Sequence, residues 1–160
     1  MKNFFIGYIL CYILSIPFLV NDHLFYTFLL GFFLYSMAYK DYRSYYIHPL
    51  CIPISIVFLV VQPYHPPFSF LSLLFGFVGI YFYSKQSMGS MDLYFLFYFG
   101  IYLGYERMIV SIFISIVIGC IFLLIKKEKL IPFITCLSIG VWISLLRGYT
   151  LFEAWIHIQF

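Results

Sequence analysis

Ser87-Met88-Gly89-Ser90-Met91-Asp92 is a short polar stretch that interrupts a chain made almost entirely of apolar residues. It ends in one of only three aspartates in the sequence. A second aspartate, Asp41, lies in another polar stretch, Lys40-Asp41-Tyr42-Arg43. We expect the apolar runs around these two stretches to bring Asp41 and Asp92 together at one face of a membrane.

The composition is that of an integral membrane protein. Hydrophobic residues make up 64% of the 160 positions and charged residues only 9%, and the mean hydropathy is +1.03. A soluble domain carries about 25% charged residues, so this chain lacks the charge to keep a folded surface in water. At about 20 residues for each crossing, the length allows six or seven transmembrane helices in a single domain, residues 1–160. The sequence therefore predicts an all-α, polytopic membrane helix bundle of short spans.

Seven apolar runs are expected to form the spans, with polar or proline-rich turns between them. The segment 105–107 is expected to be one of these turns, and residues 149–160 are expected to form a short interfacial helix after the last span. The expected spans cover approximately residues 4–20, 24–39, 47–61, 68–84, 92–104, 108–125 and 131–146.

Basic residues are distributed unevenly between the two sides that these spans define. If Lys2 is cytoplasmic, seven Lys and Arg residues fall on the cytoplasmic side and two on the other, a bias that sets the orientation of membrane proteins. Asp41 and Asp92 then both lie at the cytoplasmic face of the cell membrane, and Asp22 lies outside. The seven are Lys2, Lys40, Arg43, Lys85, Lys126, Lys127 and Lys129, and the two are Arg107 and Arg147.

Two carboxylates at one membrane face point to acid–base chemistry. Each has a simpler explanation by itself, because Asp92 could cap a helix and Asp41 could pair with Lys40 or Arg43. Together, in a chain with so few charges, they indicate a functional site. Two adjacent carboxyls cannot both ionise easily, so one can activate a water while the other polarises a peptide carbonyl. This chemistry needs no metal and no organic cofactor, and Gly89 would let an extended substrate backbone come close.

Three segments resemble the type IV prepilin peptidases, which are membrane aspartic proteases. Gly89-Ser90-Met91-Asp92 resembles the family's G-x-G-D motif. Asp41-Tyr42-Arg43, followed by Ile47, resembles D-x-(R/K)-x-x-x-I-P at its first catalytic aspartate. Ile131-Pro132-Phe133 resembles the I-P-F-G-P-F segment that opens a late span. The order and spacing of the three segments agree with the family from about residue 35 to residue 140.

The chain departs from these motifs at three places. Met91 replaces the second glycine of G-x-G-D, His48 stands where proline is expected, and Ile134-Thr135 replaces Gly-Pro. Longer members of the family also carry a cytoplasmic insert with paired C-x-x-C zinc motifs, associated with N-methylation of the mature pilin. Only residues 21–23 separate the first two expected spans here. The resemblance therefore implies a short form without the zinc insert and without methyltransferase activity.

The resemblance implies an aspartic endopeptidase that removes the basic leader of type IV prepilins or pseudopilins at the cytoplasmic face. Its partners would be that substrate and membrane lipid, with no nucleic acid, no metal and no cofactor. The sequence does not distinguish pilus, competence and secretion substrates, and it leaves the oligomeric state open. Asp41 and Asp92 would be the catalytic pair, and the residues around the substrate would be Gly89, Ser90, Met91 and Arg43.

Two other interpretations stay open. A small transporter or channel could use Asp41 and Asp92 as proton or cation sites, although such sites lie near the membrane midplane and these residues are predicted at span ends. An inactive peptidase relative that acts as an assembly factor also fits, because Met91 replaces the glycine next to the second aspartate. Convergence of the two aspartates at helix ends would favour the peptidase over the transporter.

Overall fold

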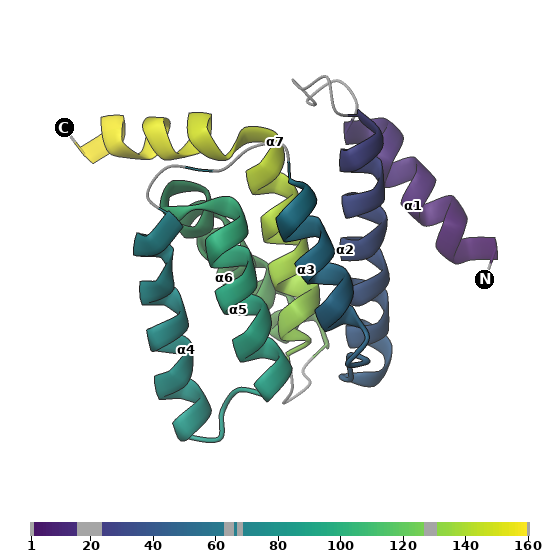
Figure 1. The fold of residues 1–160 in the computed structure, drawn as a ribbon, viewed down its shortest axis with the longest axis horizontal. Coiled ribbons are helices and arrows are strands. Elements are labelled where there is room, and N and C mark those ends of the chain that lie inside the picture. The colour runs from purple at the N-terminus through teal and green to yellow at the C-terminus, as the bar shows by residue number, and fades with distance from the viewer. Residues whose placement is uncertain (1, 16–23, 63–65, 67–68, 127–130, 160) are drawn as a thin grey trace.

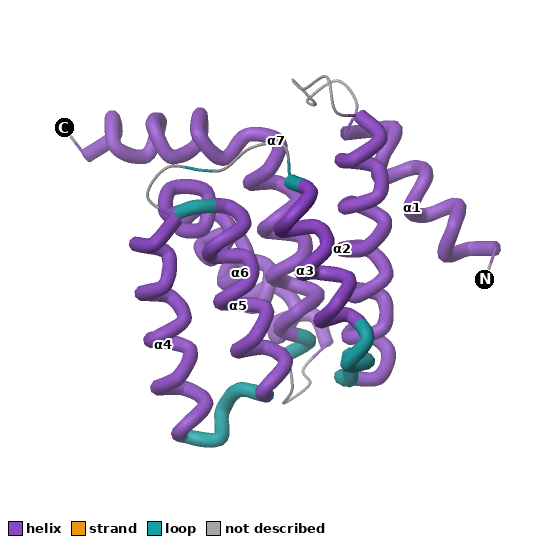
Figure 2. The backbone as a smooth tube through the Cα atoms, viewed as in Figure 1, coloured by secondary structure: helices purple, strands orange, loops and turns teal. Residues whose placement is uncertain are grey.

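The computed structural model describes residues 2–15, 24–62, 66, 69–126 and 131–159. Within these ranges the chain is entirely helical apart from its connecting segments, without a β-strand (Figure 2). The prediction of an all-α fold is therefore confirmed. The elements are α1 (Lys2–Ser15), α2 (Leu24–Ser44), α3 (Cys51–Val61), the 3₁₀-helix η2 (Ser69–Ser72), α4 (Leu73–Ser84), α5 (Ser90–Leu103), α6 (Tyr105–Lys126) and α7 (Phe133–Gln159).

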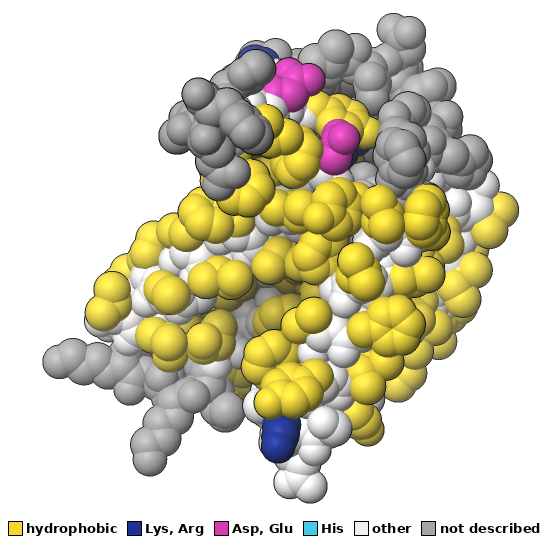
Figure 3. All heavy atoms as spheres, turned by 90° about the vertical axis from the view of Figure 1, so that its left-hand side faces the viewer, with side chains coloured by type: hydrophobic (Ala, Val, Ile, Leu, Met, Phe, Trp, Pro, Cys, Tyr) yellow, Lys and Arg dark blue, Asp and Glu magenta, His cyan; other side chains and the backbone are white. Residues whose placement is uncertain are grey.

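The outer surface of the bundle is apolar over most of its height. Two stretches, Tyr105–Ile125 and Phe133–Ile156, are long and apolar enough to cross a membrane. Large apolar side chains face outward, and Val60 and Leu124 are 75% and 79% exposed. On the face drawn in Figure 3, a broad hydrophobic band separates charged side chains at the two ends of the molecule. This distribution fits a helical membrane bundle, in which hydrocarbon rather than water surrounds the middle.

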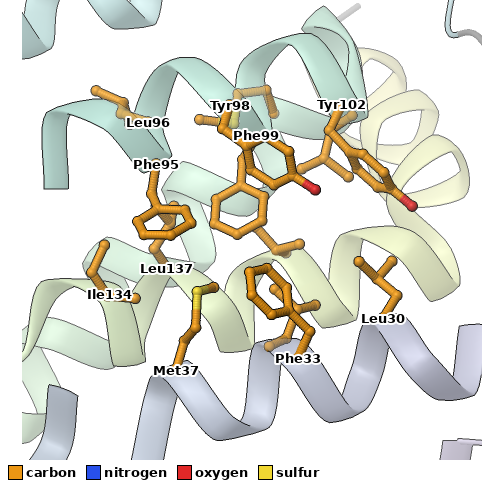
Figure 4. Packing of buried hydrophobic residues seen from close by; sticks show 14 of the residues in the cluster. Leu30, Phe33, Met37, Phe95, Leu96, Tyr98, Phe99, Tyr102, Ile134 and Leu137 are labelled. Atoms are coloured by element: carbon orange, nitrogen blue, oxygen red, sulfur yellow. The ribbon is translucent and has the colours of Figure 1, made fainter. Parts of the chain in front are cut away.

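The core lies where α2, α5 and α7 meet (Figure 4). On α5, Phe95 and Phe99 are completely buried and lie one helical turn apart. On α2, Phe33 and Met37 are one turn apart and face them. Asp41 follows Met37 at the same interval of four residues, and Asp92 precedes Phe95 by three. Each aspartate therefore continues the core-facing stripe of its helix. The remaining members of this core include Leu30, Leu34, Leu96, Tyr98, Tyr102, Leu103, Ile134, Leu137 and Val141.

Helix α2 is longer than predicted. It continues to Ser44, so the stretch 40–43 forms its last turn and is not a break after it. None of these four residues is glycine or proline, and polar side chains at the end of a membrane helix can extend toward water without ending it. The helix stops before Tyr45, which has a left-handed backbone with φ of 51°. The next helix, α3, starts at Cys51 and not near residue 47, because Pro49 disfavours helical geometry in the residue before it.

The predicted turn at residues 105–107 is wrong. These residues belong to the first turn of α6, and only Gly104 separates α5 from α6. Gly104 has φ of 76°, a conformation that glycine adopts without steric cost, so a single residue reverses the chain. Likewise α5 begins at Ser90, two residues earlier than predicted, and η2 precedes α4.

Helix α7 does not end near residue 146 as predicted. It runs without interruption from Phe133 to Gln159, so the predicted tail helix is its continuation. In Figure 1 its C-terminal part turns aside and runs across one end of the bundle. Its interfacial position stays a prediction. The predicted end of the first span, the turn with Asp22, and the basic residues 127 and 129 lie outside the described residues.

Gly140 on α7 packs tightly against α6. A Cβ atom there would overlap the carbonyl oxygen of Ser111 and the hydroxyl of Ser115, and small residues let membrane helices pack this closely. We expect Gly140→Ala to lower the free energy of unfolding by about 1–3 kcal/mol, because the helices must move apart. Thermal unfolding in detergent would measure it. The control is Gly119→Ala, whose new Cβ would lie 3.7 Å from Ile131, and equal losses in the two variants would contradict the prediction.

Candidate functional site

The two predicted aspartates lie at the same end of the bundle. Asp41 is in the last turn of α2 and Asp92 in the first turn of α5. In Figure 1 these two helix ends lie at the bottom, together with the turn between α4 and α5. The negative charge of Asp41 raises the pKa of Asp92, so the two carboxyls are close enough to repel each other. The fold therefore brings together two side chains that are 51 positions apart in the sequence.

Asp41 is held by the start of α7. Its side chain is only 5% exposed. One carboxylate oxygen, Oδ2, accepts hydrogen bonds from the backbone N–H of Thr135 at 2.8 Å and from the Thr135 hydroxyl at 3.0 Å, and that hydroxyl also lies within hydrogen-bond distance of the Ala38 carbonyl oxygen, at 2.9 Å. Thr135 lies in the first turn of α7, where backbone N–H groups lack helical partners and the helix dipole favours negative charge. This site is built to hold a carboxylate in one position.

Asp92 is held by its own helix start. It is the third residue of α5, and its Oδ2 atom accepts a hydrogen bond from the backbone N–H of Gly89 at 3.1 Å. A Cβ atom on Gly89 would lie 3.2 Å from that same oxygen, which is tighter than ordinary contact. A glycine at this position therefore makes room for the carboxyl to fold back over the chain. This contact gives a structural reason for the first glycine of the motif.

The two carboxyls differ in the groups that shift their pKa values. Both lie at helix ends, outside the two membrane-crossing stretches. Burial raises the pKa of Asp41, and the hydrogen bonds from Thr135 and from the N–H of Ile134 oppose that rise. Burial raises the pKa of Asp92 to about 6; its bond to Gly89 opposes the rise and the charge of Asp41 adds to it. More hydrogen bonds thus stabilise the carboxylate of Asp41 than that of Asp92.

The other predicted site residues occupy two different settings. Gly89 and Ser90 are exposed beside Asp92, and Met91 is half-buried in the first turn of α5. Arg43 is two residues from Asp41 along α2, about 200° around the helix. Its guanidinium lies over the ring of Tyr39, 5.0 Å from the ring centre. The structure therefore groups Gly89, Ser90 and Met91 with the aspartates and turns Arg43 toward another face of α2.

A cleft of about 360 Å³ lies between the last turns of α2, the segment 45–50 and the first turn of α3. It contains the charge of Lys40 and the imidazole of His48 among apolar side chains. Among the described residues, no group of three or more His, Cys, Asp or Glu side chains could hold a metal ion. Neither aspartate lines this cleft, but Lys40, the neighbour of Asp41 on α2, does, so the cleft adjoins the end of α2 that carries Asp41.

Thr135 is the site residue that sequence reasoning missed. The sequence marks Ile134-Thr135 as a departure from Gly-Pro, without any sign that Thr135 contacts Asp41. The only available signal was local: a threonine in the first turn after Ile131-Pro132-Phe133 can present both a hydroxyl and a free N–H at a helix start. Its partner is 94 positions away, and only the packing of α7 against α2 reveals it.

Comparison with known proteins places these observations in a family. Residues 27–124 match the type IV leader peptidase family. No curated protein and no solved structure matches the chain. The matched segment covers more than half of the sequence and includes Asp41, Asp92 and the Gly89 contact, in agreement with the resemblance seen in the motifs. The protein therefore belongs to the type IV leader peptidase family.

Proposed function

We propose that the protein is an aspartic endopeptidase that removes the basic leader of type IV prepilins or pseudopilins at the cytoplasmic face of the membrane. Membership of the family supports a leader-peptidase function in general. The aspartic mechanism rests on one observation, the placement of Asp41 and Asp92 at two helix ends that lie at the same end of the bundle (Figure 1). Both are at helix ends rather than midway along a span, which favours this function over a transporter.

In the proposed mechanism the two aspartates have different roles. Ionised Asp41 accepts a proton from a bound water, and the water oxygen forms a bond to the carbonyl carbon of the scissile peptide. Protonated Asp92 donates a hydrogen bond to the carbonyl oxygen and stabilises the negative charge that develops there. The proton on Asp41 then passes to the leaving nitrogen as the C–N bond breaks. The sum is one water consumed and one peptide bond cleaved, with no metal or organic cofactor.

The surroundings of the pair suggest how a substrate binds. The backbone around Gly89, Ser90 and Met91 starts α5 next to Asp92 and is open on its outer side. A substrate segment must be extended to reach it, because a helical peptide hides its carbonyls in its own hydrogen bonds. The apolar helix that follows the leader would lie along the hydrophobic surface of the bundle, with the basic leader among the lipid headgroups.

The pH dependence of cleavage follows from the two pKa values. Asp92 must be protonated, and its pKa is about 6, so kcat/KM is expected to fall as the pH rises through that value. Asp41 must be ionised, so the rate is also expected to fall on the acid side, near a pKa above 3.8. Assays of the purified enzyme between pH 3 and pH 9 would measure this. A rate that stays constant from pH 5 to pH 8 would contradict the assignment of Asp92 as the acid.

The first test of the function is cleavage of a candidate prepilin. The protein would be co-expressed with prepilins that carry a lysine-rich leader, and intact mass would follow loss of the leader. The matched control is a substrate whose leader lysines are changed to glutamate. Cleavage of the lysine leader alone would support the proposal. Failure to cleave any prepilin, by a folded protein in native membranes, would support the inactive assembly factor instead.

A further inference from the structure

A cavity separate from the aspartate site lies between α1, α2 and α7. Its volume is about 360 Å³, and aromatic side chains such as Tyr35, Tyr39 and Trp142 form much of its wall. Its lining on α2 extends from Gly31 to Tyr42, which is about 16 Å along the helix axis. In Figure 1, α1 diverges from α2 toward the end of the bundle that holds Asp41. The cavity is thus an elongated, mostly apolar slot along α2.

Two polar groups are associated with this slot. The guanidinium of Arg43 lies over the ring of Tyr39, which places a positive charge beside the polar end of the cavity. Ser138 lines the wall and is only 3% exposed, and its buried hydroxyl has no hydrogen-bond partner among the described residues. Buried hydroxyls in folded proteins nearly always have a partner. The slot therefore offers a cation at its mouth and an unused donor in its wall.

The shape of the slot selects a thin ligand. A helix about 10 Å wide that spanned the same length would fill roughly 1,250 Å³, more than the about 930 Å³ of empty space in the slot, which includes the space on its open side. A single extended hydrocarbon chain fits an elongated apolar slot, and the bilayer supplies such chains at very high concentration. A phospholipid also carries a phosphate that matches Arg43 and ester carbonyls that can accept a hydrogen bond from Ser138. Apolar burial alone gives little selectivity among lipids, so the charge at the mouth decides which lipid binds.

We propose that this slot binds one acyl chain of an anionic phospholipid, whose headgroup phosphate contacts Arg43. Neither aspartate lines the slot, so the lipid site is separate from the aspartate site, although Leu34 lines the slot and also belongs to the core. The two sites share one residue, Thr135, which lines the slot and donates two hydrogen bonds to Asp41. A bound chain would hold the start of α7 against α2. This consequence for Asp41 rests on the proposed peptidase activity, whereas lipid binding itself does not.

Two cysteines of the natural chain provide the test. Cys11 lines the slot and is exposed, and Cys120 is exposed on α6 and does not line it. The wild-type protein would be stripped of lipid in detergent and supplemented with phosphatidylglycerol, with phosphatidylcholine or with glycerol phosphate. Brief alkylation followed by peptide mass spectrometry would give the rate at each cysteine. We expect phosphatidylglycerol to slow alkylation of Cys11 at least fivefold relative to phosphatidylcholine, while the rate at Cys120 is the same in both.

The controls distinguish binding of the whole lipid from binding of its charged headgroup alone. Glycerol phosphate carries the anion without the chain, and protection of Cys11 by it alone would overturn the proposal. Arg43→Gln is expected to abolish the difference between the two lipids. Ile139→Trp places a large side chain in the slot. Native mass spectrometry is expected to detect bound lipid on wild type and none on this variant. Equal alkylation of Cys11 in both lipids would overturn the proposal even if Ile139→Trp failed to fold.

Discussion

Replacement of either Asp41 or Asp92 by asparagine is expected to slow leader cleavage by at least about a hundredfold, the usual contribution of a positioned acid or base. Asparagine has nearly the shape of aspartate but neither accepts nor releases a proton in this pH range. Without Asp41 no group would take the proton of the attacking water. Without Asp92 no carboxylic acid would stabilise the oxyanion. The measurement is the initial rate of leader removal in membranes that contain equal amounts of each variant.

The stability of the variants distinguishes lost chemistry from lost structure. The folded state raises the pKa of Asp92 to about 6, so folding favours its neutral form and the ionised form is destabilising at pH 7. Wild-type stability is therefore expected to rise as the pH falls from 7 toward 5. Asp92→Asn removes both the buried charge and its repulsion with Asp41. We expect this variant to melt no lower than wild type at pH 7 while being inactive.

Glu153→Gln is the matched control, because it removes an exposed carboxylate in α7, far along the chain from either aspartate. It is expected to cleave at the wild-type rate. Full activity in Asp41→Asn or Asp92→Asn would show that the pair is not catalytic. Inactivity in all three variants would indicate that cleavage depends on overall charge rather than on the pair.

That the two aspartates lie at one end of the bundle could be predicted from the charge pattern of the sequence. Charge bias predicts that Asp41 and Asp92 lie on one side of the membrane, with two spans between them. The core face of each helix could not be predicted, because both helices are apolar on nearly every side; the structure shows it, since buried Met37 precedes Asp41 by four residues and buried Phe95 follows Asp92 by three. Helix bundles keep such stripes facing one another, so the ends of two stripes meet.

The ends of the helices were predicted less well, for a physical reason. In a soluble protein a polar run commonly marks a loop, but the ends of membrane helices lie among headgroups, where polar side chains are solvated without breaking the helix. The sequence thus predicts turns at Lys40 and Glu106, although each lies inside a helix. Gly104 is a better marker, because glycine adopts a positive φ without steric cost, whereas nothing in the sequence marks the positive φ of Tyr45 at the end of α2.

Thr135→Val is expected to shift the acid side of the pH–rate profile upward by up to about one pH unit. The Thr135 hydroxyl shares its single proton between the Asp41 carboxylate and the Ala38 carbonyl, so its bond to Asp41 is worth less than the about 1.5–3 kcal/mol of an unshared hydrogen bond to a charged group. Its loss therefore raises the pKa of Asp41 by at most about one unit, at about 1.36 kcal/mol per unit. The alkaline side reports Asp92, which Thr135 does not contact, and is expected to stay in place. The measurement is kcat/KM across the pH range, in which a purely structural defect would lower the rate equally at every pH.

Other substitutions of Thr135 remove different numbers of its hydrogen-bond donors to Asp41. Thr135→Ser keeps the hydroxyl and the N–H, so it should restore the wild-type profile. Thr135→Pro removes both donors, and proline is tolerated in the first turn of a helix, where backbone N–H groups have no helical partner. It should therefore move the acid side further than valine does. Thr150→Val, which removes a hydroxyl that bonds only to the Arg147 carbonyl in the exposed part of α7, should change nothing. If the acid side moves in none of these variants, Asp41 does not supply the base. If it moves in the predicted order, this chain uses a threonine, where the motif that it resembles has proline, to keep Asp41 ionised while Asp92 holds the proton.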